Sequence, residues 1–181
     1  PENVIVTVGA SEALYISAQA FMEPGDEILL PDPSFLLYES VINLAGGSIV
    51  PVDCKMENEF KLKAEDVLEK ITPKTKAIFL NSPSNPTGAV MDKEDIKAIA
   101  DLSMDHNFLI ISDEIYEKLI YEGEHVSIAS FNDEIKDLTI IINGVSKAYA
   151  MTGWRIGYLA AAEWIVKGCN KLQGQYTSGP C

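Results

Sequence analysis

One segment of the sequence carries two cations and no acidic residue. Residues 143–158 read Asn-Gly-Val-Ser-Lys-Ala-Tyr-Ala-Met-Thr-Gly-Trp-Arg-Ile-Gly-Tyr, and Lys147 and Arg155 are the only charged residues in the wider stretch 138–162. The whole chain, in contrast, has a formal net charge of −13. An ammonium group and a guanidinium group without competing carboxylates favour an anionic ligand. We therefore expect this segment to bind an anion.

Lys147 follows a short β-branched run, residues 138–143, which predicts a buried strand that ends in a turn. Most lysines lie at the surface, with the stem on apolar neighbours and the ammonium group in water. Apolar neighbours and a second cation would instead favour the neutral amine, a nucleophile that can form an imine with a carbonyl compound. The position of Lys147 alone leaves both interpretations open.

Other side chains that could do chemistry also follow predicted strands. Each has a simpler interpretation: a helix start that binds water, an aromatic side chain in the core, a rigid turn or a solvated carboxylate. Ligands of open α/β sheets, however, bind outside the carboxyl ends of the strands. We therefore expect one crevice to bring together the following residues: Gly9, Ala10, Ser11, Phe35, Asn85, Asp113, Tyr116 and Lys147.

The elements that position these residues alternate between strand and helix patterns. Apolar, β-branched runs predict strands at residues 4–8, 27–30, 48–53, 76–80, 108–112, 138–143 and 154–161. Helix patterns lie at residues 9–22, from 34 onward, and at 64–71, 92–105 and 162–173. Ser11 or an adjacent residue is the expected cap of the first helix, and Asp92 is the expected cap of the helix at 92–105. This alternation predicts a three-layer α/β/α domain with a mostly parallel sheet of about seven strands.

The amino-acid composition excludes several kinds of partner and site for this protein. With 181 residues, 47% of them apolar, the chain can bury a sizeable core. The acidic balance argues against a nucleic-acid partner. Three widely spaced cysteines suggest neither a disulfide framework nor a zinc site, and they fit reduced thiols in a cytoplasm. We read His106 and His125 as structural or surface residues, and we expect no metal site, no signal peptide and no membrane span.

Residues 146–158 resemble the lysine signature of class I and II aminotransferases, which are pyridoxal-phosphate enzymes of fold type I. The resemblance implies that Lys147 holds the aldehyde of pyridoxal 5′-phosphate as an internal aldimine and that Arg155 binds its phosphate, with Ser146 also at the cofactor. One position departs from the family. A phosphate-binding serine is often found where this chain has Gly144, and here a backbone amide could replace the hydroxyl.

Two further segments resemble signatures of the same family. Asn-Pro-Thr-Gly at residues 85–88 implies that Asn85 donates a hydrogen bond to the 3′ oxygen of the cofactor. Ser-Asp-Glu-Ile-Tyr-Glu at residues 112–117 implies that Asp113 pairs with the pyridine nitrogen and Tyr116 with the 3′ oxygen. The resemblance makes Lys147, Asp113 and Tyr116 the catalytic residues.

The ring and phosphate contacts are implied in the same way. Residues 31–38 resemble the family's Pro-x-x-x-Tyr/Phe-x-x-Tyr segment, whose first aromatic, here Phe35, stacks on the pyridine ring. The turn at Gly9, Ala10 and Ser11 resembles the one that contacts the cofactor phosphate.

The implied function is transfer of an amino group from an amino acid, aspartate or aromatic, to a 2-oxo acid. The chain has a single arginine, Arg155, so the arginine that the family uses for the substrate carboxylate is absent. We therefore expect residues 1–181 to be the cofactor-binding large domain of a longer homodimeric enzyme, without its N-terminal segment and C-terminal small domain, and inactive when isolated. A C–S lyase, a decarboxylase, a synthase or a non-catalytic cofactor-binding regulator stays open.

Overall fold

Apolar strands of the sequence assemble into one sheet in the order β1-β7-β6-β5-β4-β2-β3. The structure is a computed structural model that describes residues 2–181; Pro1, the first residue of the expected domain, lies outside the described residues. β7 is antiparallel to both neighbours, and the other strands run in one common direction. The strands are β1 (Val4–Val8), β2 (Glu27–Asp32), β3 (Ser48–Asp53), β4 (Thr75–Asn81), β5 (Leu109–Asp113), β6 (Thr139–Gly144) and β7 (Ile156–Ala160).

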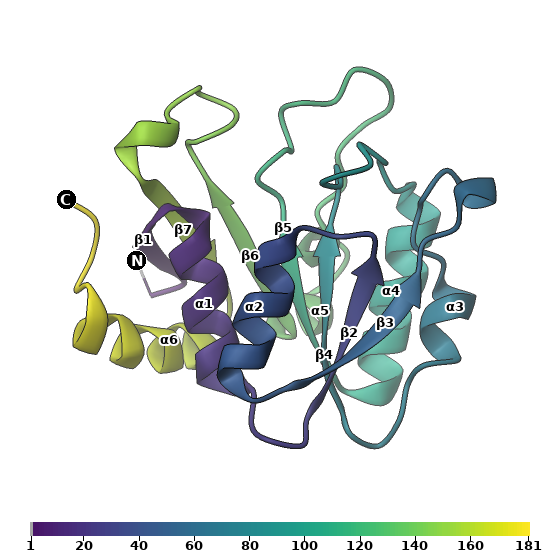
Figure 1. Cartoon of the computed structure of the whole chain (residues 1–181), viewed down its shortest axis with the longest axis horizontal. Coiled ribbons are helices and arrows are strands. Elements are labelled where there is room, and N and C mark those ends of the chain that lie inside the picture. The colour runs from purple at the N-terminus through teal and green to yellow at the C-terminus, as the bar shows by residue number, and fades with distance from the viewer. Residues whose placement is uncertain (1) are drawn as a thin grey trace.

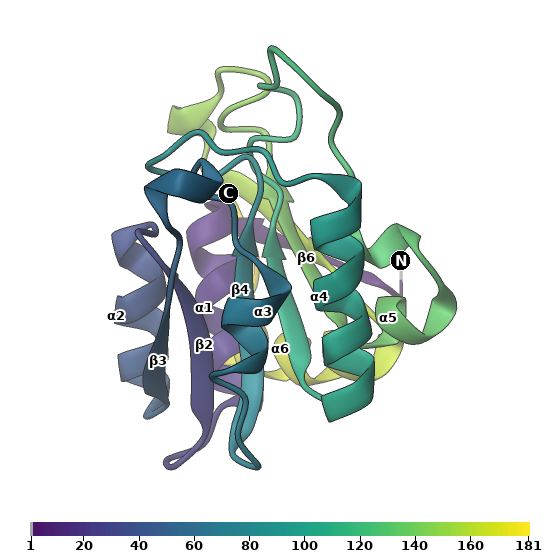
Figure 2. The same cartoon turned by 90° about the vertical axis from the view of Figure 1, so that its right-hand side faces the viewer.

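Helices cover both faces of this sheet (Figure 1). Figure 2 shows α1 and α2 on one face and α3, α4 and α5 on the other. The C-terminal helix, α6, packs with α1, and buried residues of both helices belong to one apolar cluster. The helices are α1 (Gly9–Phe21), α2 (Leu36–Ala45), α3 (Ala64–Leu68), α4 (Lys93–His106), α5 (Asp133–Asp137) and α6 (Glu163–Tyr176), with the short 3-10 helices η1 (Met56–Asn58), η2 (Ile128–Ser130) and η3 (Thr152–Trp154). The predicted three-layer architecture with a mostly parallel sheet is thus confirmed.

The hydrophobic core lies in two clusters, one on each face of the sheet. Ile111 of β5 belongs to the cluster beneath α1 and α2, while its neighbour Ile110 belongs to the cluster beneath α3 and α4. All five residues of β5 are buried, as expected for a central parallel strand covered on both sides. The carboxyl end of β5 is therefore held rigidly.

The two expected helix caps have different outcomes: Asp92 is the residue that precedes α4, as expected, whereas Ser11 does not cap α1. α1 begins at Gly9, so Ser11 lies inside its first turn, and the Glu12 carboxylate accepts a hydrogen bond from the Val8 amide at 2.6 Å. Asp92 does precede α4, but its side chain makes no cap hydrogen bond and instead accepts one from the Lys61 ammonium group at 3.1 Å. A carboxylate near a helix start can bind a lysine ammonium group in place of a backbone amide, because the charged donor gives the stronger hydrogen bond.

Two helix predictions also differ from the structure. α3 ends at Leu68, three residues early, because the next residues form tight turns ahead of Pro73, which disfavours helix at the residue before it. The five-residue helix α5 was not expected. Its cap is recognisable in the sequence, since the Asn132 side chain accepts a hydrogen bond from the Ile135 amide at 2.8 Å. Among residues 2–181, no helix combines the length and apolar character that a bilayer crossing needs.

Candidate functional site

A pocket of about 180 Å³, open to solvent, lies at the carboxyl end of the parallel strands. The segments that follow β4, β5 and β6 come together there, at the top of the molecule in Figure 1. Nine of the ten residues predicted from the sequence line it: Ala10, Ser11, Phe35, Asn85, Asp113, Tyr116, Ser146, Lys147 and Arg155. The tenth, Gly9, lies directly against the Arg155 guanidinium group.

Asp113, the last residue of β5, places a buried carboxyl group in the pocket. It is 4% exposed and accepts hydrogen bonds from the Tyr38 hydroxyl at 2.8 Å and from the Ile115 amide at 3.2 Å. Burial raises the pKa of Asp113 to about 6, although these two donors and the charge of Lys147 oppose the rise. The pKa of Tyr38 is raised well above its usual value, first by burial and then by Asp113, so Tyr38 is the proton donor of this pair.

The loop that carries Asn85 is tied to the same strand end through Asn81. The Asn81 side chain accepts a hydrogen bond from the Asn85 amide and donates one to the carbonyl oxygen of Asp113, both at 2.8 Å. Asn81 and Asp113 are also register partners in the β4–β5 pair. Two prolines stiffen the loop, so a single amide side chain fixes Asn85 relative to Asp113.

The start of α1 and the Arg155 guanidinium group form the cationic part of the pocket. Gly9 has φ +71°, and a Cβ atom built on it would lie 2.4 Å from Arg155 Nη2. Arg155 itself takes a left-handed conformation after η3 and donates from Nη1 to the Thr152 carbonyl at 2.9 Å. Free amides at the start of a helix, beside a guanidinium group, favour an anion such as a phosphate.

Lys147 lies at the opening of this pocket rather than in an apolar interior. Its side chain is exposed, with Nζ 5.5 Å from the centre of the Tyr116 ring. The apolar surroundings considered from the sequence are therefore not supplied by the described residues. The Tyr116 ring face instead offers a cation–π contact to the ammonium group.

The Gly144 amide is not free to act as the backbone amide that could replace a phosphate-binding hydroxyl. It donates to the Asn143 side chain at 2.7 Å, and Gly144 is buried at the end of β6 and does not line the pocket. A Cβ atom at this position would lie 2.9 Å from the Gly157 Cα atom and from the Ile156 carbonyl oxygen. A serine is excluded here because β6 and β7 approach too closely.

The described residues fit the cofactor that the resemblance implies. The amides at the start of α1 lie next to Arg155 with space that any Cβ atom on Gly9 would fill. A buried carboxyl group, suited to a cationic partner, lines the same pocket as the Lys147 amine. An aldehyde cofactor with a phosphate group and a ring nitrogen would need three groups from the protein. These are an anion site for the phosphate, a carboxylate for the ring nitrogen and an amine for the aldehyde.

Sequence reasoning missed Tyr38, Leu14, Ile115 and Thr152 in the pocket lining. Tyr38 is the consequential omission because it is the side-chain donor to Asp113. Tyr38 lies three residues after Phe35, the residue that precedes α2, and the two rings meet edge to face at 5.6 Å between centres. Spacing could not show that the Tyr38 hydroxyl reaches a strand end 75 residues further along the chain.

Comparison with known proteins gives consistent matches along the whole chain. The family model for aminotransferases of class I and II matches residues 1–181. An aspartate aminotransferase of Bacillus subtilis is 48% identical over 181 residues, covering 99% of this chain and 46% of that protein. An aspartate/prephenate aminotransferase of Thermus thermophilus is 44% identical, covering 99% of this chain and 46% of that protein.

Solved structures match equally well. The aspartate aminotransferase of Thermus thermophilus with maleate aligns with a TM-score of 0.96 at 44% identity, over 99% of this chain and 46% of that one. The aromatic aminotransferase of Pyrococcus horikoshii aligns with a TM-score of 0.95 at 42% identity, over 98% of this chain and 48% of that one. The chain thus spans about half the length of the relatives it matches.

Proposed function

Because the chain belongs to the class I and II aminotransferase family, we propose that it is the cofactor-binding large domain of an aminotransferase that uses pyridoxal 5′-phosphate. The proposed reaction moves the amino group of an amino acid, aspartate or aromatic, to a 2-oxo acid. One observation carries this proposal: Asp113, at the end of β5, lines a single pocket together with Lys147 and Arg155, which lie in the segment between β6 and β7.

The cofactor, when bound, supplies an electron sink for the negative charge that develops when an amino acid loses its α proton. Asp113 places a carboxylate for the ring nitrogen, and its charge would hold a proton on that nitrogen. Arg155 and the first amides of α1 would hold the phosphate, and Phe35 would hold the ring. Asn85 and Tyr116 supply hydrogen bonds for the 3′ oxygen.

Lys147 is the proposed catalytic base as well as the amine that attaches the cofactor. Once its Nζ atom is free, Lys147 would take the proton from the substrate α carbon and hold it for return. The Tyr116 ring, 5.5 Å from Nζ, limits where the amine can lie. Transamination requires this shuttle in both halves of the reaction.

The whole enzyme extends beyond this chain in our proposal, since the relatives are about twice as long. It would be a cytoplasmic homodimer with its site at the subunit interface. The thiols of Cys54, Cys169 and Cys181 are unpaired, which supports a reducing compartment.

Reductive trapping tests the site directly. The purified chain is mixed with pyridoxal phosphate, reduced with borohydride, digested and mapped by mass spectrometry. We expect modification concentrated on Lys147, and we expect it to be lost in Asp113→Ala and in Arg155→Ala. Scattered labelling over many lysines in both this chain and the protein from the complete reading frame would overturn the proposal.

The reaction class needs a separate assay on the protein from the complete reading frame. We expect 2-oxo acid formation from aspartate or an aromatic amino acid only when an acceptor 2-oxo acid is present. Release of ammonia without an acceptor would instead identify a lyase on the same cofactor site.

A further inference from the structure

Glu114 is a buried carboxylate that the proposed reaction does not use. It stands between Asp113 and Tyr116 in the chain, yet it is absent from the pocket that those two residues line. Its exposed fraction is only 5%. A buried carboxylate away from the reacting groups needs compensating hydrogen bonds, so its partners indicate its role.

Three side chains donate to the Glu114 carboxylate. Oε1 accepts from the hydroxyls of Ser112 at 3.0 Å and Ser127 at 2.8 Å, and Oε2 pairs with His125 Nε2 at 3.0 Å. The Glu114 amide also donates to the Ile142 carbonyl at 2.8 Å, which ties this residue to β6. Both oxygens of the carboxylate are therefore satisfied.

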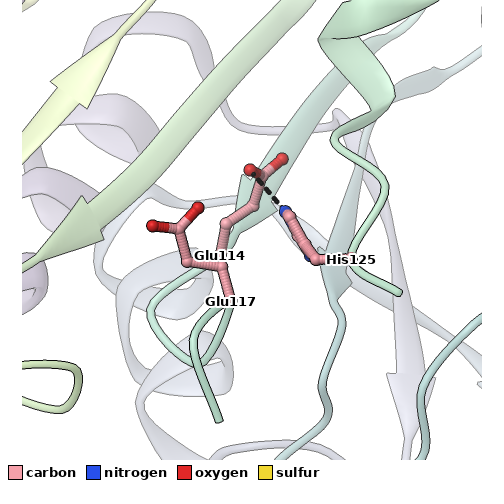
Figure 3. A group of neighbouring side chains, drawn as sticks. All are labelled: Glu114, Glu117 and His125. Carbon is pink, nitrogen blue, oxygen red and sulfur yellow. Dashed lines mark hydrogen bonds and ion pairs between the residues drawn. The ribbon is translucent and has the colours of Figure 1, made fainter. Parts of the chain in front are cut away.

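Figure 3 shows the Glu114–His125 pair with Glu117 beside it. The candidate ligand atoms of Glu114, Glu117 and His125 lie within 4.8 Å of one another, a grouping that could suggest a cation site. Because Glu114 already accepts three side-chain hydrogen bonds, the group is better explained as a clamp between two segments. Ser112 and Glu114 belong to the strand end, whereas His125 and Ser127 belong to the chain that returns after the loop 117–124.

The turn held by this clamp carries Tyr116, a proposed site residue, and directly follows Asp113. The Glu117 amide donates to the Glu114 carbonyl at 3.0 Å, and the Leu119 amide donates to the Tyr116 carbonyl at 2.8 Å. Tyr116 is thus fixed between Glu114 on one side and the start of the loop on the other. Movement of the Glu114 side chain would be transmitted to Tyr116 through this hydrogen-bonded turn.

We propose that Glu114 is a positioning residue for the cofactor, acting through Tyr116, with His125 and Ser127 as its partners. This inference rests on the proposed function, because Tyr116 matters here as a contact of the cofactor's 3′ oxygen. Glu114 touches neither cofactor nor substrate. Its clamp sets the position of the Tyr116 hydroxyl and holds the loop 117–124 beside it.

The test uses the protein from the complete reading frame, loaded with pyridoxal phosphate. Glu114→Ala is expected to raise the cofactor dissociation constant about tenfold. It should also move the pH at which the visible absorption of the bound cofactor changes by about half a pH unit or more. Glu114→Gln, which keeps the shape and one acceptor oxygen, should recover much of both losses.

Glu117→Gln is the matched control. Glu117 carries the same charge in the same turn, but among residues 2–181 its carboxylate forms an ion pair with Lys118 alone, at 3.7 Å. We expect Glu117→Gln to leave the cofactor dissociation constant within about twofold of wild type. The pH at which the visible absorption changes should stay the same. Ser127→Ala added to Glu114→Ala should cause little further loss, since the acceptor of its hydrogen bond is already gone.

Three outcomes would overturn the inference in distinguishable ways. If wild type fails to bind the cofactor at Lys147, the proposed function fails and this inference with it. If Glu114→Ala lowers the melting temperature but leaves the dissociation constant and the absorption unchanged, Glu114 is only structural. If Glu117→Gln changes the dissociation constant and the absorption as much as Glu114→Ala does, the effect comes from nearby negative charge and not from the clamp.

Discussion

The carboxyl group of Asp113 is buried in the free chain, although its proposed role needs a negative charge. Burial raises the pKa of Asp113 to about 6, whereas its ordinary value is 3.8. A folded-state pKa above the unfolded-state value means that the folded chain holds this proton more tightly. The stability that the group contributes is full below pH 3.8 and is lost as the pH rises to about 6.

Asp113→Asn should therefore stabilise the cofactor-free chain at neutral pH while abolishing cofactor function. We expect a gain in the free energy of unfolding of up to about 3 kcal/mol at pH 7.5, shrinking to nothing below pH 4. Urea unfolding at pH 7.5, 6 and 4 measures the difference. Equal stabilities of the two proteins at every pH would show that the buried charge is not costly.

Tyr38→Phe tests the donor of the Asp113 pair. The phenyl ring keeps its packing against Phe79, whose ring centre lies 5.1 Å away, and against Phe35, but the hydrogen bond to Asp113 is lost. We expect the pKa of Asp113 to rise further and kcat of the full-length enzyme to fall about tenfold with little change in KM. An unchanged kcat would mean that the Ile115 amide alone orients the carboxylate.

At the scale of elements, the phosphate end of the pocket depends on how closely β7 approaches the start of α1. A Cβ atom on Gly157 would lie 2.4 Å from the Gly9 carbonyl carbon and from the Ala10 nitrogen. The β1–β7 pairing brings Val8 opposite Ile156, so Arg155 arrives beside Gly9. Glycine at both contact points lets two neighbouring elements share one anion site.

Gly9→Ala should weaken anion binding more than it weakens the fold. The new methyl group would meet Arg155 Nη2 at 2.4 Å, and the left-handed φ of +71° is unfavourable for alanine by about 1 kcal/mol. We expect at least a tenfold increase in the pyridoxal phosphate dissociation constant, measured by absorbance titration. Gly153→Ala is the control, because a Cβ atom there meets nothing within 4 Å. Equal effects of both substitutions would argue against a role of Arg155 in binding.

The elements show where sequence reasoning succeeds and where it ends. Long apolar runs such as β5 and β6 are recognisable because their burial on both faces leaves a continuous β-branched pattern. The five-residue α5 is too short for a periodic signal. Topology explains why the pocket residues come together, since the carboxyl ends of the parallel strands lie at the same edge of the sheet.

Side-chain orientation could not be predicted in the same manner. A sequence gives the residue type of Tyr38 and Glu114 but not the distant group that each one meets. Lys147 shows the converse limit, since its local sequence left a surface lysine and a desolvated amine both open, and the tertiary structure leaves its side chain exposed. Pairs far apart in the chain, such as Tyr38 with Asp113, depend on how α2 packs on the sheet.

At the scale of the whole molecule, the proposed site connects segments from Gly9 to Arg155. A ligand that binds all of them only in the folded state stabilises the entire chain, by about 2.7 kcal/mol at a concentration 100 times its dissociation constant. For a chain of 181 residues, this corresponds to a rise in melting temperature of about 5–10 °C.

Thermal unfolding of the chain with increasing pyridoxal phosphate should show that rise, and it should saturate. Inorganic phosphate engages only the α1 and Arg155 end of the pocket, so it should give a much smaller shift at the same concentration. Lys147→Ala should bring the cofactor's effect close to that of phosphate, because the covalent attachment is lost while the anion contacts remain. Equal shifts with pyridoxal phosphate and with phosphate in wild type would mean that the ring is not held, and that Asp113 and Lys147 do not act with Arg155 as one site in this chain.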